Sequence, residues 1–186
     1  HGYGYLAEYF IRSFEVLLNQ AVLIVAPEGL NKFYKNGLEG DVGASWMTKA
    51  DRLNEIKDYN RYLDNLYDKI FQKIDREMVQ VIILGFSQGS STACRWITEG
   101  NVIVDNLVIW SGGIPDDLNF NEFKKVLSEK PLQVVVGDND EFIKEFDIEA
   151  HLSFLKERHI NCNLRRFSGG HEIDQQTLKR LANELH

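Results

Sequence analysis

Short apolar runs alternate with segments of helical spacing along most of the chain. Runs rich in valine and isoleucine are typical of strands buried on both faces, and here they occupy residues 21–26, 81–84, 107–110 and 132–136, with a half-polar run at 163–167. Between them, apolar residues recur at the spacing of amphipathic helices, over residues 6–17, 53–74, 90–97, 120–127, 146–159 and 178–185. This alternation predicts a mostly parallel sheet with helices on both faces.

The composition is that of one globular domain. The chain has 186 residues, of which 44% are hydrophobic, and 21 basic against 28 acidic residues give a net charge of −7. An acidic chain is a poor partner for nucleic-acid phosphates. No apolar run approaches the ~18 residues of a membrane span, and no signal peptide is visible. Cys94 and Cys162 lack metal-ligand spacing, so we expect two buried thiols in a cytoplasmic protein.

A serine lies between two glycines directly after the apolar run 81–84. The segment Gly85-Phe86-Ser87-Gln88-Gly89 matches G-x-S-x-G and is followed by a helical pattern. Strand, tight turn and helix are the context of a nucleophile elbow, in which glycines two positions to either side leave room for the turn. The alternative is a glycine-rich turn with a chance serine.

A serine nucleophile needs a base, and the base needs a carboxylate that fixes its tautomer. Catalytic groups of such sheets gather beyond the carboxyl ends of the strands. Two predicted strands end there in polar loops, one with Asp138, Asp140 and Glu141, the other with His171. The order serine, acid, histidine is that of α/β-hydrolases. The alternative for His171 is a solvent-exposed loop residue. His151 falls in a predicted surface helix and competes poorly.

Four segments together resemble the phospholipase/carboxylesterase family of α/β-hydrolases, which includes the acyl-protein thioesterases. They are His-Gly-Tyr-Gly at 1–4, Gly-Phe-Ser-Gln-Gly at 85–89, Gly-Asp-Asn-Asp at 137–140 and Gly-Gly-His-Glu-Ile at 169–173. The resemblance covers nearly the whole chain in the family's order. It implies an α/β-hydrolase fold. The connection from Ser111 to Pro131 is mostly used by the predicted helix at 120–127, which leaves no room for a separate cap domain, and we expect no cofactor. The acidic loop lacks the pattern of a calcium site, and we expect no metal.

The resemblance also implies roles for individual residues. Ser87 matches the nucleophile, His171 the base and Asp140 the triad acid, and the backbone N–H groups of Tyr3 and Gln88 match the oxyanion donors. Glu141 stands where the family usually has proline, which leaves Asp138 open as the alternative acid.

These residues predict a serine carboxylesterase that hydrolyses short- to medium-chain esters or thioesters through an acyl-enzyme. The alternatives are a serine peptidase with the same triad and a non-catalytic binding protein of this fold. The expected partner is a small-molecule ester or thioester, without nucleic acid or a membrane span, and a homodimer stays open.

Residues 28–47 show no sustained period and predict a long loop, which in a compact domain is usually functional. Its aromatic residues Phe33, Tyr34 and Trp46 are expected to wall the acyl side of a groove. Trp46 also resembles the family's loop tryptophan. The alternative is that the aromatic residues only anchor the loop.

The order of elements predicts a strand outside residues 1–186. An oxyanion loop must leave from the end of a strand, yet the first predicted strand, 21–26, follows a helix. We therefore expect residues 1–186 to form a single α/β-hydrolase domain to which at least one further strand, before His1, belongs.

Overall fold

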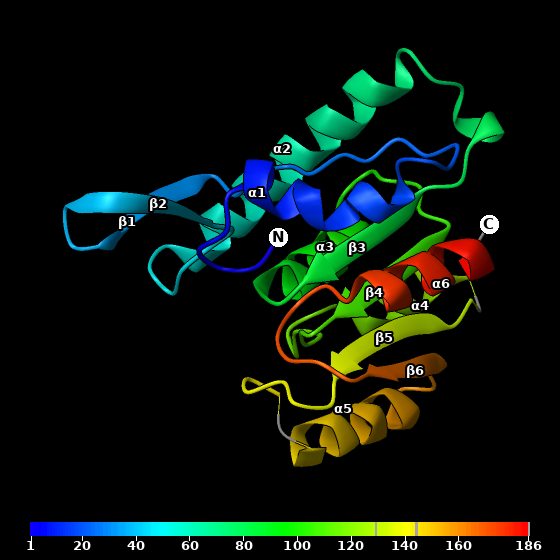
Figure 1. Cartoon of the computed structure of the whole chain (residues 1–186). Coiled ribbons are helices and arrows are strands. Elements are labelled where there is room, and N and C mark those ends of the chain that lie inside the picture. Colours follow the sequence, from blue (N-terminus) through cyan, green and yellow to red (C-terminus); the bar gives the residue numbers. More distant parts are fainter. Residues whose placement is uncertain (129, 144, 186) are drawn as a thin grey trace.

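A computed structural model of the chain describes residues 1–128, 130–143 and 145–185. Its centre is a parallel sheet in the order β3-β4-β5-β6 (Figure 1). The strands are β3 (Ile82–Phe86), β4 (Asn106–Trp110), β5 (Leu132–Gly137) and β6 (Cys162–Phe167). These confirm four of the five expected strands. Because all four run in the same direction, their carboxyl ends and the loops that follow them meet at one edge of the sheet.

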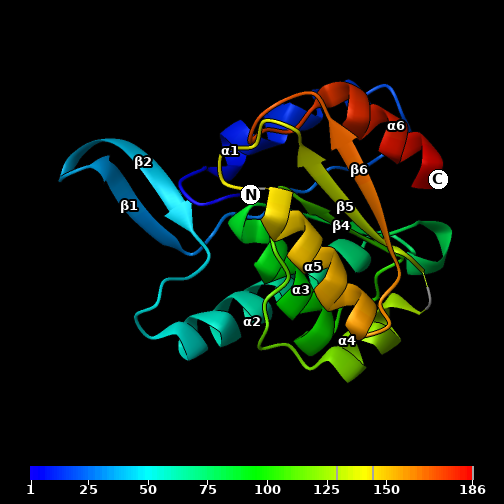
Figure 2. The same cartoon turned by 90° about the horizontal axis from the view of Figure 1, so that it is seen from below.

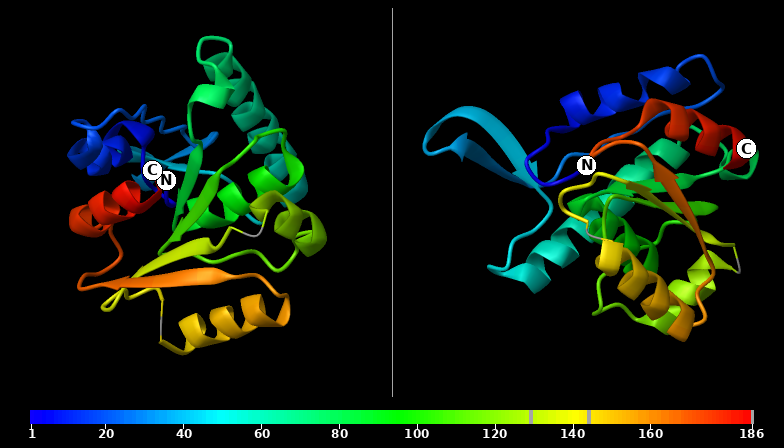
Figure 3. Two further views of the ribbon diagram at one scale, coloured as in Figure 1. Left: turned by 90° about the vertical axis from the view of Figure 1, so that its right-hand side faces the viewer. Right: turned by 60° about the horizontal axis from the view of Figure 1, so that its bottom comes forward.

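Helices cover both faces of the sheet, as expected (Figures 2 and 3). One face carries α1 (Ala7–Phe10), the 3-10 helix η1 (Ile11–Leu17) and α6 (Gln175–Leu185), and the other carries α2 (Arg52–Phe71), α3 (Gln88–Glu99), α4 (Phe120–Leu127) and α5 (Glu145–Glu157). A short 3-10 helix, η2 (Arg76–Met78), follows α2. Side chains alternate between the two cores, so Leu107 and Ile109 pack under α2–α5 while Val108 and Trp110 pack under η1 and α6.

The expected strand at 21–26 is wrong for this structure. The segment is apolar but forms no strand, because β3 pairs with β4 on one side and the described chain places no strand between β3 and this segment. Backbone hydrogen bonds to a neighbour define a strand, so a suitable composition alone does not form one.

The expected loop at 28–47 is also wrong over most of its length. It contains an antiparallel hairpin of β1 (Asn31–Asn36) and β2 (Glu39–Ser45), which projects from the body (Figure 1). Both strands are polar and largely exposed, so they lack the apolar alternation that marks a half-buried strand. The available signal was the glycine at position 37. Gly37 is the first residue of the two-residue hairpin loop, where it adopts a positive φ of 72°.

Two further expectations concern the whole chain. Cys94 is buried and Cys162 half-buried, and both are free thiols. Among the described helices, none combines the length and apolar character that crossing a bilayer requires.

Candidate active site

Ser87 lies on a strained turn between β3 and α3. Its φ of 53° and ψ of −120° fall outside the regions that non-glycine residues ordinarily adopt. A Cβ at Gly85 would lie 2.5 Å from the carbonyl oxygen of Gly89, and one at Gly89 would lie 2.7 Å from the carbonyl oxygen of His1. Only glycine fits at both positions. The turn is held because the Ser87 N–H donates to the Trp110 carbonyl at 2.9 Å. This is the geometry of a nucleophile elbow.

His171 and Asp140 form a direct pair at the same edge of the sheet. The Nδ1 atom of His171 lies 3.0 and 2.9 Å from the two carboxylate oxygens of Asp140. The Asp140 side chain is fully buried, and its Oδ1 also accepts the Phe142 N–H at 3.0 Å. A carboxylate at Nδ1 fixes the tautomer in which Nδ1 carries the proton and Nε2 is free to act as a base.

Asp138, the alternative acid, lies elsewhere. Its side chain is half-exposed, and its Oδ1 is 3.6 Å from Nη1 of Arg166. The acidic loop turns back after this residue, because the Asp140 N–H donates to the Gly137 carbonyl. The turn points Asp140, rather than Asp138, towards His171.

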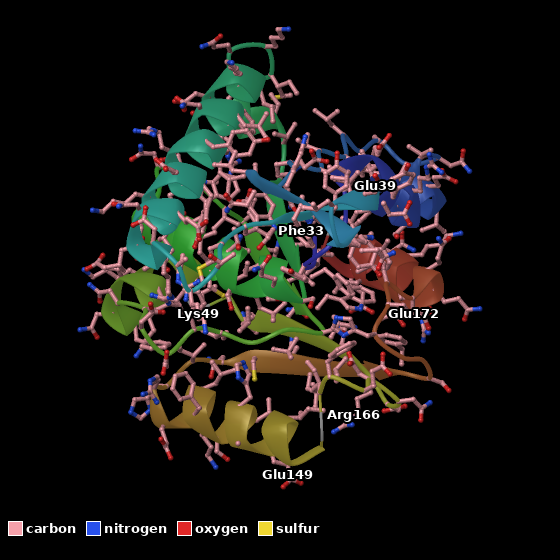
Figure 4. All side chains as sticks on the ribbon, turned by 90° about the vertical axis from the view of Figure 1, so that its left-hand side faces the viewer. Phe33, Glu39, Lys49, Glu149, Arg166 and Glu172 are labelled. Carbon is pink, nitrogen blue, oxygen red and sulfur yellow. The ribbon has the colours of Figure 1, made fainter. Side chains whose placement is uncertain are left out.

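The acidic loop and the histidine loop are packed against each other through their backbones. A Cβ at Gly137 would lie 2.4 Å from the Gly169 carbonyl oxygen, and that same oxygen accepts the Asn139 N–H at 2.9 Å. On the other side, the indole N–H of Trp110 donates to the Glu172 carbonyl at 2.8 Å. Glu172 and Arg166 are labelled in Figure 4, which looks onto this side of the molecule. Short contacts therefore fix the positions of acid and base.

Two phenylalanines hold the His171 ring beside the elbow. The ring centroid of Phe86, the residue before Ser87, is 4.9 Å from that of His171. Phe142, from the acidic loop, lies 4.7 Å away in an edge-on arrangement. The imidazole is thus held between the end of β3 and the loop that carries Asp140.

The segment 1–4 crosses directly over Ser87. A Cβ at Gly2 would lie 3.0 Å from the Cβ of Ser87, and the Gly4 N–H donates to the Ala44 carbonyl at 2.8 Å. Within the described chain, the N–H groups of Tyr3 and Gln88 have no protein acceptor. Gln88 is the first residue of α3, whose N-terminal N–H groups and dipole favour negative charge. Both amides are therefore free to donate to an oxyanion.

The three predicted aromatic residues lie in three different places. Trp46 is only 3% exposed and belongs to the core, where its indole N–H donates to the His1 carbonyl at 2.9 Å. Phe33, labelled in Figure 4, stacks on the Tyr3 ring at 4.9 Å. Tyr34 is exposed and, as the next residue of β1, points to the opposite face of the hairpin. Trp46 and Phe33 therefore support the segment that carries the Tyr3 N–H.

A cavity of about 230 Å³ lies next to residues that contact Ser87 and His171, although no triad residue lines it. Its lining includes Gly112, where a Cβ would lie 2.5 Å from the Ser87 carbonyl oxygen, and Phe142, which packs on His171. His151 of α5 also lines it, and its Nε2 is buried without a hydrogen-bond partner among the described residues. Burial lowers the pKa of His151, which keeps the ring neutral. Helical spacing could not identify His151 as a cavity residue, because such spacing predicts a helix but not the cavity that the helix lines.

Over the ranges that the structure describes, no three histidine, cysteine or acidic residues are grouped so that they could hold a metal ion. The site brings together the serine, the histidine–aspartate pair and two backbone N–H groups. A hydroxyl at an elbow, an imidazole held by a carboxylate and free N–H donors are the parts required for acyl transfer to a serine.

The chain is similar to known proteins in sequence and in fold. The family model described as Phospholipase/Carboxylesterase matches residues 1–186. Comparison with curated proteins gives no match. A crystal structure of an uncharacterized protein from Bacillus cereus ATCC 10987 is similar over all of this chain and 58% of its own, with a TM-score of 0.71 and 21% identity. The chain thus spans less than two thirds of that protein.

Two plant proteins are covered more completely. Arabidopsis thaliana SOBER1 is similar over all of this chain and 94% of its own, at 20% identity and a TM-score of 0.70. Zea mays acyl-protein thioesterase 2 is similar over all of this chain and 91% of its own, at 17% identity and a TM-score of 0.65. At such identities these structures establish the shared fold, the α/β-hydrolase fold that the sequence predicts.

Proposed function

Because the chain belongs to the phospholipase/carboxylesterase family, we propose that it is a serine hydrolase that cleaves carboxylic esters or thioesters through an acyl-enzyme. The observation that carries the proposal is the contact of 2.9–3.0 Å between His171 Nδ1 and the buried Asp140 carboxylate, beside a serine in the elbow conformation. A histidine held in this way has Nε2 available as a base for the serine hydroxyl.

The first half of the reaction transfers the acyl group to the enzyme. The Ser87 oxygen attacks the carbonyl carbon while His171 Nε2 accepts the hydroxyl proton. The carbonyl oxygen becomes the oxyanion of a tetrahedral intermediate, to which the N–H groups of Tyr3 and Gln88 donate. The bond to the alcohol or thiol then breaks, and the imidazolium returns its proton to the leaving group. Asp140 stabilises the imidazolium while it carries that proton.

The second half uses water in place of the hydroxyl. Water attacks the acyl carbon of the ester on Ser87, and His171 takes one of its protons. The second tetrahedral intermediate collapses, the Ser87 oxygen recovers a proton from His171, and a carboxylic acid leaves. Every proton moves through Nε2 of one histidine, so no cofactor is required.

The cavity beside the triad supports a preference for short to medium acyl chains. Its volume of about 230 Å³ is below the ~300–1,000 Å³ that is typical of pockets for drug-sized ligands. It is lined by the apolar residues Val134, Val136 and Leu152 among others. We place the acyl chain in this cavity, which leaves the alcohol or thiol on the side of Phe33 and the exposed hairpin.

A fluorophosphonate probe tests the proposal, because it reacts only with an activated serine. The chain should be labelled at Ser87, and Ser87→Ala should abolish both labelling and ester hydrolysis. The matched control is Ser153→Ala on the exposed side of α5, which should retain both. Hydrolysis by Ser87→Ala at the normal rate would refute the proposal. Rates on matched ester, thioester and amide substrates then separate an esterase from a peptidase, because a peptidase would cleave the amide.

A further inference from the structure

The side chain of Gln88, the residue after the candidate nucleophile, bonds to a distant part of the chain. Its Oε1 accepts the Trp46 N–H at 3.0 Å. Its Nε2 donates to the Met47 carbonyl at 2.9 Å and to the Ser45 hydroxyl at 3.1 Å. The first residue of α3 is therefore tied through its side chain to the end of the hairpin strand β2 and the two residues that follow it.

The partners of this amide fix its orientation. A backbone N–H can only donate and a backbone carbonyl can only accept, so Oε1 must face Trp46 and Nε2 must face Met47. The Ser45 hydroxyl lies 2.9 Å from the same carbonyl, to which it donates, and its lone pairs stay available for Gln88. Glutamine carries a donor and an acceptor on one planar group, whereas an ionised glutamate has no donor. The contact is therefore specific for an amide.

Residues 44–47 also hold the segment that carries the other proposed oxyanion donor. The Gly4 N–H donates to the Ala44 carbonyl at 2.8 Å. The Trp46 indole N–H donates to the His1 carbonyl at 2.9 Å. These two bonds fix both ends of segment 1–4. The same four residues thus contact the start of α3 on one side and segment 1–4 on the other.

The peptide group between Gly2 and Tyr3 is oriented within its own segment. His1 Nε2 accepts the Gly29 N–H at 2.8 Å, so the ring proton lies on Nδ1, which is 2.8 Å from the Gly2 carbonyl oxygen. The Tyr5 N–H donates to the same oxygen. Because the peptide is trans, the Tyr3 N–H points away from these two donors. The direction of this N–H is set here, and its distance from the Gln88 N–H must be set by other contacts.

No hydrogen bond within the described ranges joins segment 1–4 directly to the elbow at 85–89. The two meet through close packing, as where Gly2 lies against the Cβ of Ser87. Such packing limits how closely they approach but does not prevent them from moving apart. The hydrogen bonds through residues 44–47 supply that restraint.

We propose that the Gln88 side chain is a positioning residue, which sets the distance between the two N–H groups that bind the oxyanion. It does so by tying the start of α3 to residues 44–47, which hold segment 1–4. The inference rests on the proposed function, in which the Tyr3 and Gln88 N–H groups donate to the oxyanion. Both can donate to one oxygen only at the right separation, and a displacement of about 1 Å can cost ~10²-fold in rate. Because the charge develops in the transition state, the side chain acts on kcat more than on KM.

Gln88→Met tests the proposal, because it keeps the length of the side chain and removes both its donor and its acceptor. It should lower kcat roughly 10- to 100-fold, less than the 10²–10³ lost when an oxyanion donor is removed outright. The KM should change by less than about twofold. A trifluoromethyl ketone adds to Ser87 and places its oxygen where the oxyanion forms, so its inhibition constant should rise by the factor by which kcat/KM falls. A normal kcat would overturn the proposal.

The matched control acts at the other end of α3. Asn60 of α2 donates through Nδ2 to Glu99, the last residue of α3, at 3.0 Å. Asn60→Leu replaces a buried amide by an apolar side chain of similar size, as Gln88→Met does. It should lower the denaturant midpoint and leave kcat unchanged. An equal loss of kcat in both variants would show that loosening of α3, rather than the position of its first N–H, lowers the rate, and would overturn the proposal.

Hydrogen exchange tests the contact itself without a substrate. In Gln88→Met the Trp46 amide should exchange on the order of tenfold faster, whereas the Ile109 amide of the interior strand β4 should be unchanged. Equal exchange of Trp46 in both chains would contradict the contact. If Gln88→Met does not fold, Ser45→Ala removes one partner of the amide and should give a smaller loss of kcat at unchanged KM.

The unmodified chain separates this inference from the proposed function. Absence of ester hydrolysis and of inhibition by the ketone in the unmodified chain would refute the proposed function, and this inference with it. Hydrolysis by the unmodified chain together with a normal kcat of Gln88→Met would refute this inference alone.

Discussion

The carboxyl end of the sheet and the outer edge of β3 are built in opposite ways. At the carboxyl end, polar groups meet partners at short range, as in the Asn139 N–H bonded to Gly169 and the Trp110 indole bonded to Glu172. At the outer edge of β3, apolar side chains of the facing segment 21–26 such as Leu23 stay exposed, and in the described sheet Leu84 has a paired strand only on the side of β4. In the described chain, the first region is held by paired polar groups, and the second is an apolar strand edge without a paired strand on its outer side.

This difference shows which parts of the site are positioned by contacts between neighbouring loops and which are positioned by more distant elements. The acid and histidine loops are fixed by each other, because Gly137 and Gly169 allow their backbones to touch. Segment 1–4, which carries the proposed oxyanion donor Tyr3, is fixed from outside, by the Trp46 indole and by the hairpin residue Phe33. It begins at His1, which lines an apolar groove along β3. The His171–Asp140 pair should therefore tolerate changes at this groove better than segment 1–4 does.

The largest expected effect comes from a substitution in the histidine–aspartate pair at the carboxyl end of the sheet. Asp140→Asn removes the carboxylate at His171 Nδ1 and should lower kcat by ~10⁴, because the wrong tautomer of the histidine is then favoured. The matched control is Asp138→Asn in the same loop, whose half-exposed side chain lies near Arg166 and should change kcat by less than about tenfold. Initial rates of ester hydrolysis measure both. Should Asp138→Asn be the more damaging, the acid has been assigned to the wrong residue.

The sequence predicts the carboxyl end of the sheet better than it predicts the outer edge of β3. The spacing of Gly85, Ser87 and Gly89 carries a steric requirement, and the contacts of both glycines show why no other residue fits. The contact between His171 and Asp140 was foreseen from strand ends and from a family resemblance. The choice over Asp138 needed the structure, because it depends on where a three-residue turn points.

The failures have different physical causes. Residues 21–26 have strand composition, but a strand exists only when a neighbour pairs with it, and the periodicity of one segment cannot report on that neighbour. The hairpin 31–45 was missed for the opposite reason, since its pairing is present while its exposed strands lack an apolar pattern. Trp46 was expected at a groove surface, yet its polar N–H is used inside the core.

The second prediction sharpens the comparison through pH. Burial lowers the pKa of the His151 imidazole below its ordinary value of 6.5. Between the folded and the unfolded pKa the unfolded chain binds a proton that the folded chain does not, so the free energy of unfolding should rise as the pH increases through this range to above 6.5. Denaturant titrations across this range measure it.

The control for the pH effect is His151→Leu, which removes the titrating ring. An equal rise in the variant and in the unmodified chain would mean that His151 does not cause it.

The third prediction tests whether Trp46 positions segment 1–4 for catalysis or only stabilises the fold. Trp46→Phe removes the donor to the buried His1 carbonyl and should lower the free energy of unfolding by about 1–3 kcal/mol. It should also lower kcat, since the carbonyl lies two residues before the Tyr3 N–H. Trp96→Phe is the matched control, because its indole donates to Asp64 at 2.8 Å, away from the site. It should lose stability and keep kcat. A normal kcat for Trp46→Phe would show that the Trp46 indole N–H does not contribute to the function of the site.

The smallest expected effect concerns the cavity of about 230 Å³ at the carboxyl end of the sheet. His151 presents a buried Nε2 without a partner in the described chain, so it favours an acyl chain that carries a hydrogen-bonding group and disfavours one that is wholly apolar. His151→Leu should raise kcat/KM for wholly apolar medium-length acyl esters by severalfold, and leave that for the shortest ester unchanged. The control is Ser153→Leu on the exposed side of the same helix. A profile of kcat/KM against acyl length checks both variants. If the two profiles match that of the unmodified chain, the acyl group does not lie in this cavity and belongs instead on the side of Phe33.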